Sequence, residues 1–266
     1  MTARGDLHRW AVVGGGMLGL TLALRLRQAG YEVTVIEGHG RPGGLTTAWR
    51  VGDWVWDRHY HVILESDAYL RAILAELGLD GDIRWTETRT GCFADGRLFP
   101  ASTPLELMRL PFLSLLGRVR LATNLAYGSS VRDGRPLEEV PIADWLTCWS
   151  GRSVYQKFWR PLLEAKLGEN RRHASAAFIW ATMRRLGAAR RRGLRRERFG
   201  YVTGGYARVL DRFASFLEEA GVSLLLGSRV RRVPGLDGRL TVEREDGETD
   251  HFDRVVVTAA PPLARR

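Results

Sequence analysis

The sequence predicts an α/β fold in which a mostly helical insertion interrupts the sheet-forming part of the chain. Residues 9–37 read as a strand, a glycine turn, a helix and a second strand. Across 101–185, apolar side chains recur three and four residues apart, as on amphipathic helices. A further helix is expected over 206–220. Three β-type runs follow it, at 222–226, 240–243 and 252–258.

These patterns divide the chain into three segments. We expect 1–85 and 199–266 to form one domain and 86–198 to form the insertion. With 266 residues and 45% apolar composition, the chain has ample material for a buried core. The arginine-rich run over 188–198 is expected to be a solvated loop that closes the insertion.

Charge and cysteine content narrow the class of protein. The net charge of +10 comes almost wholly from arginine, because Lys157 and Lys166 are the only lysines. An arginine bias of this kind also follows from genomic base composition, so we expect no nucleic-acid partner. Cys92 and Cys148 are too few for a disulfide framework and lack metal-ligand spacing. We expect no metal and a cytoplasmic location, with no signal peptide or membrane span.

A phosphate-binding glycine motif follows the first predicted strand. Residues 14–19 read Gly-Gly-Gly-Met-Leu-Gly, which matches G-x-G-x-x-G between a strand and a helix. Gly14 permits the tight turn, Gly16 leaves room for a pyrophosphate, and Gly19 lets the helix pack closely on the sheet. Met17 and Leu18 open the helix, whose free N–H groups favour a negative charge. The motif predicts a Rossmann-like dinucleotide site.

An acidic residue ends the second predicted strand. Glu37 lies 23 residues beyond Gly14, where a carboxylate accepts hydrogen bonds from ribose hydroxyls and repels a 2′-phosphate. The pattern therefore disfavours NADP, but it does not separate FAD from NAD.

A second glycine pair decides between those cofactors. Arg41, Gly43, Gly44, Leu45 and Thr46 follow the second strand in the run Arg-Pro-Gly-Gly-Leu-Thr. The first motif followed by R-x-G-G resembles the flavin-containing amine oxidase superfamily, which includes protoporphyrinogen oxidase and phytoene desaturase. The resemblance implies FAD as cofactor and a GR2-type FAD-binding domain carrying a substrate-domain insertion. The family often has an arginine where this chain has Leu45.

The resemblance extends to the last third of the chain. Residues 201–261 are similar to the second FAD-domain segment of the family, in which the residue matching Val230 contacts the adenine side through its backbone. The family also carries a further carboxy-terminal segment that completes the flavin site and the substrate domain. Because the sequence stops at Arg266, we expect a fragment, a frameshifted product or a short form.

Candidates for catalysis and substrate contact are less specific. His59 and His61 lie in an aromatic run over 54–61, where strand alternation would place both on one face. Lys166 lies in the expected insertion. Each has a structural or solvated alternative. The insertion also holds aromatic residues that suit either an apolar pocket or core packing: Trp145, Trp149, Phe158, Trp159 and Trp180.

The leucine- and arginine-rich stretch over 105–125 suits either peripheral contact with a membrane or a covering helix.

Taken together, the sequence predicts an FAD-dependent oxidoreductase. It would remove hydride from, or isomerise, an apolar or amine-bearing small molecule. Two alternatives stay open: a truncated FAD-binding module without turnover, and an NAD-linked dehydrogenase.

Overall fold

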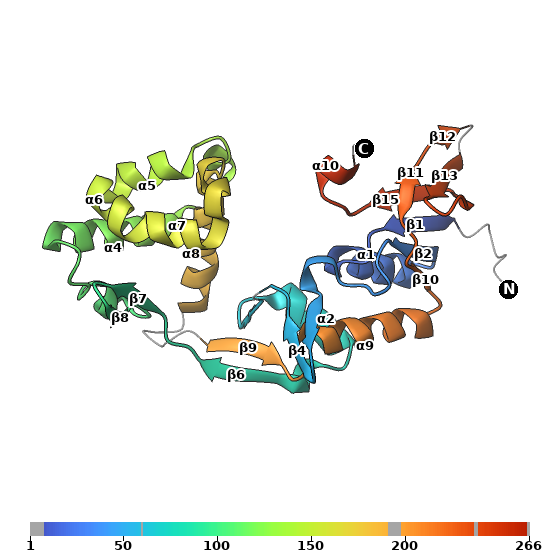
Figure 1. Cartoon of the computed structure of the whole chain (residues 1–266), viewed down its shortest axis with the longest axis horizontal. Helices are drawn as coiled ribbons and strands as arrows, with labels where there is room; N and C mark the ends of the chain where they lie inside the picture. The colour runs from blue at the N-terminus through green and yellow to red at the C-terminus, as the bar shows by residue number, and fades with distance from the viewer. Residues whose placement is uncertain (1–7, 60, 191–197, 237–238, 265–266) are drawn as a thin grey trace. The chain divides into compact units, whose positions relative to one another are not determined.

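The structure is a computed structural model that describes residues 8–59, 61–190, 198–236 and 239–264. The chain forms two compact units. The first comprises Met1–Ile63, Ala68–Arg84 and Tyr201–Arg266, and the second comprises Leu64–Asp67 and Trp85–Gly200. Figure 1 shows the helices gathered in the second unit, whereas the first mixes strands and helices. A division into a sheet-forming part and a mostly helical insertion follows from the periodicity of the sequence.

A four-stranded parallel sheet forms the centre of the first unit. Its strand order is β10-β2-β1-β15, and every neighbouring pair is parallel. Ala11 and Val12 of β1 and Val33, Val35 and Ile36 of β2 are at most 1% exposed, so both faces of these strands are covered, which explains their apolar sequences. The strand bounds are β1 (Arg9–Val13), β2 (Glu32–Glu37), β10 (Ser223–Leu226) and β15 (Arg254–Val257). The predicted α/β fold with a parallel sheet is therefore confirmed.

Two long helices belong to this unit, α1 (Met17–Gln28) and α9 (Gly205–Glu219). Helix α1 ends at Gln28, shortly before Gly30, which has a left-handed φ of 92° that is typical of residues following a helix. Helix α9 buries one face, formed by residues that recur three or four positions apart: Tyr206, Val209, Leu210, Phe213 and Leu217. The remaining helical segments are α2 (Ala68–Glu76), the short helices η1 (Gly44–Thr46) and η2 (Asp80–Asp82), and α10 (Pro261–Ala264).

Three smaller sheets contain the strands β3–β6, β9 and β11–β14. An antiparallel sheet joins β11 (Val230–Arg232), β12 (Gly235–Leu236), β13 (Arg239–Arg244) and β14 (Thr249–Phe252). A two-stranded ribbon joins β3 (Ala48–Val51) to β4 (Trp54–Asp57). The chain passes between the units through β5 (Ile63–Leu64), β6 (Ile83–Glu87) and β9 (Arg198–Val202), which form a third sheet.

The second unit is a helical bundle preceded by a hairpin of β7 (Gly91–Ala94) and β8 (Arg97–Pro100). Its longest helices are α4 (Leu115–Ser130) and α8 (Ala176–Arg190), which pack against each other. The shorter helices are α3 (Pro104–Leu107), η3 (Arg135–Leu137), α5 (Ile142–Ser150), α6 (Arg152–Val154), η4 (Tyr155–Trp159), α7 (Arg160–Leu167) and η5 (Gly168–Arg172).

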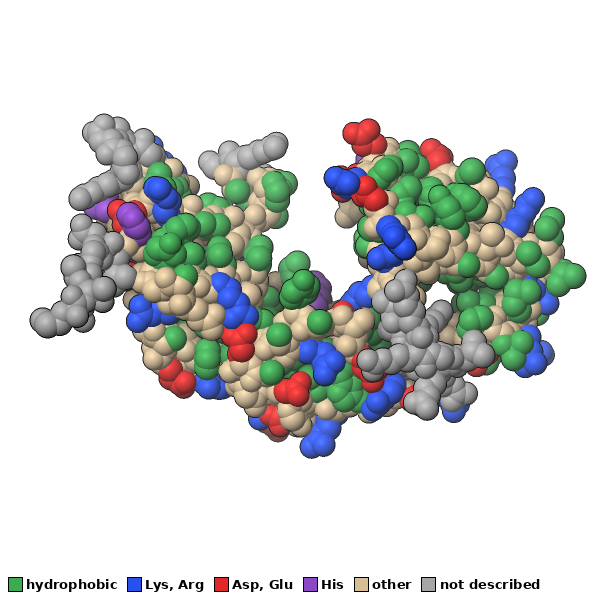
Figure 2. All heavy atoms as spheres, turned by 180° about the vertical axis from the view of Figure 1, so that it is seen from behind, with side chains coloured by type: hydrophobic (Ala, Val, Ile, Leu, Met, Phe, Trp, Pro, Cys, Tyr) green, Lys and Arg blue, Asp and Glu red, His purple; other side chains and the backbone are tan. Residues whose placement is uncertain are grey.

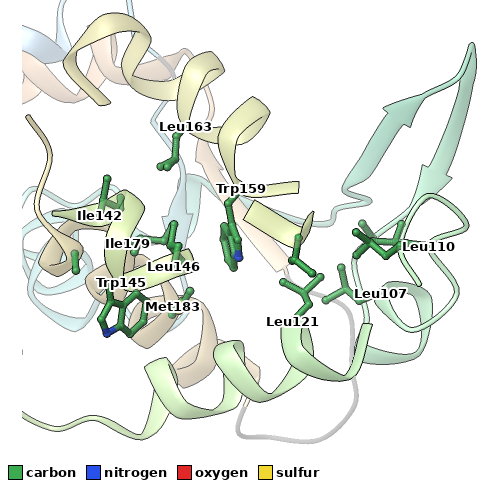
Figure 3. Packing of buried hydrophobic residues seen from close by; sticks show 14 residues of the cluster. Leu107, Leu110, Leu121, Ile142, Trp145, Leu146, Trp159, Leu163, Ile179 and Met183 are labelled. Carbon is green, nitrogen blue, oxygen red and sulfur yellow. The ribbon is translucent and has the colours of Figure 1, made fainter. Parts of the chain in front are cut away.

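The core of the helical unit explains two of its tryptophans. Trp145 and Trp159 are only 6% and 2% exposed, and they lie among leucines and isoleucines from several helices (Figure 3). Trp159 Nε1 donates a hydrogen bond to Ser150 Oγ at 3.1 Å, so its polar edge is satisfied. Both rings are part of the hydrophobic core. Trp149 instead stacks on Tyr127 with ring centroids 3.8 Å apart and remains 36% exposed.

Two local expectations are wrong. Strand β4 ends at Asp57, and Arg58 and His59 form a bend, so strand alternation does not relate His59 to His61. The expected loop over 188–198 is wrong at both ends, because α8 continues to Arg190 and β9 starts at Arg198. A run of alanine and arginine favours helix more than glycine-based loop reasoning suggests. The intervening 191–197 lie outside the described residues.

Within the described residues, no helix combines the length and apolar character needed to cross a membrane. Figure 2 shows one face of the molecule, on which arginine side chains are scattered among acidic ones rather than gathered in a single patch.

Candidate functional site

The first glycine loop lies at the carboxyl end of β1, in the first unit. Gly14 has a φ of +110°, and a Cβ there would lie 2.6 Å from Thr258 Oγ1. A Cβ on Gly19 would lie only 1.9 Å from the carbonyl oxygen of Gly14. Both positions therefore require glycine for the loop to close on itself. Gly16 differs, because a Cβ there would meet nothing within 4 Å. The loop thus leaves open space at Gly16 alone of these three.

The loop leads directly into the amino terminus of α1. Gly16 caps this helix with an extended backbone, and no side chain caps the first turn. The first turn also holds no acidic residue. Its backbone N–H groups therefore have no side-chain acceptor, which is the arrangement that receives anions at helix amino termini. Leu18, in the same turn, is 68% exposed.

Glu37 ends β2 directly beside the glycine loop. The residue is only 9% exposed. Its Oε2 accepts a hydrogen bond from the Gly15 N–H at 2.6 Å, and its Oε1 accepts one from the His39 N–H at 2.9 Å. The His39 ring also approaches Oε1, with Nδ1 at 3.0 Å. The carboxylate therefore fixes the middle of the glycine loop, a role that the sequence pattern does not reveal.

The second glycine pair meets the first glycine loop. The Gly43 N–H donates to the Gly15 carbonyl oxygen at 2.7 Å, and Gly16 and Gly43 form an isolated parallel bridge. Gly43 has a φ of +138°, and a Cβ there would lie 2.6 Å from Leu210 Cδ1 of α9. A Cβ on Gly44 would lie 3.4 Å from the Gly16 Cα. The two motifs therefore form one continuous glycine-lined surface.

The neighbours of this pair differ in exposure and bonding. Arg41 is exposed and has no ion pair within the described part of the chain. Leu45 is 75% exposed, and Thr46 Oγ1 donates to the Gly43 carbonyl oxygen at 2.7 Å. The free guanidinium of Arg41 thus remains available to an anion near the loops.

Val230 lies in a strand whose preceding segment is bonded to the chain just after β2. The segment before it bonds to the residues after β2: the Gly227 N–H donates to the His39 carbonyl, and the Ser228 N–H donates to the Glu37 carbonyl, both at 2.9 Å. This anchoring places the start of β11 beside the acidic end of β2. Neither backbone contact could be predicted from side-chain identity.

Thr258 connects the last strand to the glycine loop. It follows β15, and its Oγ1 donates to the carbonyl oxygens of Val13 and Gly14 at 3.1 and 3.2 Å. The hydroxyl therefore supports the turn from the opposite end of the chain. Sequence reasoning did not select Thr258, although its position at a strand end beside the motif strand is the available signal.

The proposed catalytic candidates belong to different units, His59 and His61 to the first and Lys166 to the second. His61 Nδ1 lies 2.6 Å from the carbonyl oxygen of His59, and its ring centroid lies 5.3 Å from that of Tyr206. Lys166 is exposed on α7 of the second unit. Among the described residues, no group of three or more His, Cys, Asp and Glu side chains suits a metal ion.

Comparisons with known proteins agree with this geometry. The family model for flavin-containing amine oxidoreductases matches residues 18–266. The chain is 26% identical over 274 residues to AofH of Mycobacterium tuberculosis, named as a flavin-containing monoamine oxidase, and 28% identical over 284 residues to coproporphyrinogen III oxidase of the same species. Both alignments cover 96% of this chain but only 57% and 60% of those proteins.

Among solved structures, putrescine oxidase bound to putrescine has the same fold, with a TM-score of 0.74 and 19% sequence identity. That match covers 97% of this chain and 59% of the oxidase. The chain thus spans a little over half the length of the relatives it matches. The breadth of the family match nevertheless identifies it: the chain belongs to the flavin-containing amine oxidoreductase family.

Proposed function

We propose that the first unit binds FAD and that the protein is a flavin-dependent oxidoreductase. The observation that carries the proposal is the hydrogen bond between the two glycine motifs, with the Gly43 N–H on the Gly15 carbonyl and Glu37 beside them. A nicotinamide site needs only the first motif. The second glycine pair extends the surface on which a longer dinucleotide is held.

The residues present fit that cofactor. A pyrophosphate needs space at Gly16 and free N–H groups at a helix amino terminus, and this structure offers both. A carboxylate has about four acceptor positions. At Glu37, the Gly15 N–H, the His39 N–H and the His39 ring occupy three of these acceptor positions, so about one position remains for a ribose hydroxyl. The residues proposed to hold FAD are Gly14, Gly16, Met17, Leu18, Gly19, Glu37, Arg41, Gly43, Gly44, Leu45, Thr46 and Val230.

Bound FAD would supply the hydride acceptor for substrate oxidation. The chain's own task is then to bind and orient the cofactor and to exclude water. We propose the second unit as the substrate domain, acting on an apolar or amine-bearing small molecule. This follows the names of the relatives, which include amine and porphyrinogen oxidases. His59, His61 and Lys166 stay as candidates for contact with substrate.

The proposal is tested by purifying the full chain and titrating it with FAD while following flavin fluorescence and absorbance. We expect saturable binding that the Gly16→Val variant loses, because its side chain would fill the space at the loop. Gly81→Val is the matched control, since Gly81 also has no neighbour within 4 Å of a Cβ and no positive φ. Equal FAD affinity in wild type and Gly16→Val would contradict the assignment.

A binding module without turnover is the second candidate function. Its supporting observation is that the chain spans only 57–60% of the length of its curated relatives. Anaerobic mixing of the FAD-loaded chain with an amine or a porphyrinogen distinguishes the two. Bleaching of the flavin absorbance supports the oxidoreductase, whereas unchanged absorbance with tight FAD binding supports the module.

We further propose a cytoplasmic location, because Cys92 and Cys148 are both free thiols in the structure. Peripheral contact with a membrane would involve the start of α4, where Leu115 and Leu116 are 71% and 60% exposed beside arginines. Vesicle sedimentation with and without anionic lipid tests that contact.

A further inference from the structure

An exposed aromatic face covers one side of the β3–β4 ribbon. The cross-strand pairs are Trp49 with Trp56 and Val51 with Trp54. Because side chains alternate along a strand, these four residues lie on the same face. Trp49 is 51% exposed, Val51 68%, Trp54 78% and Trp56 74%. We call this the Trp face, comprising Trp49, Val51, Trp54 and Trp56.

The other side of the ribbon is already used. Arg50 and Val55 alternate with the Trp face residues, and they line a groove together with Ala207 and Arg208 of α9. The ribbon therefore faces α9 with the side that carries Arg50, Val55 and Asp57, whose Oδ1 accepts a hydrogen bond from the Tyr206 N–H at 3.0 Å, and it turns the Trp face outward. This is the reverse of the usual pattern, in which the apolar face of a ribbon is covered. A two-stranded ribbon alone is also marginally stable, so a covering surface would stabilise it.

We propose that the Trp face is the contact surface of a homodimer, in which it packs on the Trp face of a second copy. The three tryptophans together expose about two whole side chains, which is roughly 300–500 Å². A standard interface buries about 800 Å² on each partner. The Trp face thus supplies the apolar centre of a modest interface, and its polar surroundings supply the rim.

The charges at the two ends of the ribbon complement each other. Asp53 lies in the exposed turn at the tip, and Arg58 lies at the base, with its guanidinium 6.0 Å from the centroid of the Trp49 ring. Neither has an ion pair within the described part of the chain. In a twofold dimer with antiparallel ribbons, each tip meets the partner's base. Asp53 of each copy then faces Arg58 of the other, which favours a second copy as the occupant.

The test is sedimentation equilibrium of the full chain over about 1–100 µM, a range that covers modest interfaces. We expect a reversible monomer–dimer equilibrium. The double variant Trp54→Ser/Trp56→Ser should weaken dimerisation about tenfold or more, because it removes the most exposed part of the face. Leu115→Ser/Leu116→Ser is the control, since these residues are similarly exposed but lie in the second unit. It should leave the equilibrium unchanged.

Charge reversal tests the twofold geometry. Asp53→Arg alone should weaken dimerisation, because it places two positive groups together. Adding Arg58→Asp should restore dimerisation, since each pair is then reversed in sign. Circular dichroism of each variant checks that it folds. A chain that is monomeric at every concentration would overturn the proposal and assign the Trp face to a different polypeptide. Dimers that are insensitive to the tryptophan variant, or a charge swap without recovery, would overturn it as well.

Discussion

Replacing Gly19 with alanine tests whether internal closure of the glycine loop, rather than the cofactor, fixes this residue. The new Cβ would lie 1.9 Å from the Gly14 carbonyl oxygen, and real Cβ contacts are essentially never below 3.0 Å. Helix α1 and the loop must therefore separate by about 1.1 Å, against close packing of α1 on the sheet. The neighbour is backbone, so no side-chain rotation relieves the overlap.

The size of the effect follows from two opposing terms. Overpacking of this kind costs about 1–3 kcal/mol. Alanine in place of glycine in a helix returns up to about 1 kcal/mol. We expect a net loss of about 1–2 kcal/mol in the free energy of unfolding, which lowers the Tm of a chain of this size by roughly 2–8 °C. The assay is thermal unfolding followed by circular dichroism, without added FAD.

Gly16→Ala is the control, because it lies in the same loop but would meet nothing within 4 Å. Its backbone φ of −74° is also open to alanine. Gly16→Ala should keep the wild-type Tm and bind FAD at least about tenfold more weakly, a difference of about 1.4 kcal/mol. Gly19→Ala should lower the Tm of the apoprotein. A Gly19→Ala variant as stable as wild type would refute the reasoning on loop closure.

Three further predictions follow from single contacts. Thr258→Val removes the hydroxyl that bonds to two carbonyls of the glycine loop, so it should cost about 1 kcal/mol of stability and weaken FAD binding in a titration. Asn124 is fully buried with neither amide atom bonded among the described residues, so Asn124→Leu should raise the free energy of unfolding, measured by urea denaturation, by about 1–3 kcal/mol. The hydrogen bond from Arg25 lowers the pKa of the Glu76 carboxyl. Wild type should therefore be more stable than Glu76→Gln above the ordinary carboxyl pKa, and this advantage should vanish as the pH falls through the lowered pKa of Glu76. Because the ion pair is partly exposed, the difference in the free energy of unfolding should be less than about 1 kcal/mol.

The sequence predicted the glycine loop better than its surroundings, because the loop depends on backbone geometry that only certain residues allow. Gly14 and Gly19 are readable as a motif since any Cβ there would collide with the chain. Helix α9 was predicted to within one residue at each end because its apolar spacing is regular. The expected strand alternation of His59 and His61 was wrong, because β4 ends at Asp57. Strand ends depend on tertiary pairing, which alternation alone does not contain.

The contacts that the sequence could not supply are those that join distant segments at the glycine loop. Gly15 bonds to Glu37 and Gly43, and Gly14 is supported by Thr258 from the far end of the chain. Each of these bonds uses a backbone group of the loop, so the identity of Gly15 carries no sign of its partners. The loop is consequently formed only when β1, β2 and β15 are paired in register. Cofactor affinity should therefore report on the folding of the whole parallel sheet, and not on the first fifty residues alone.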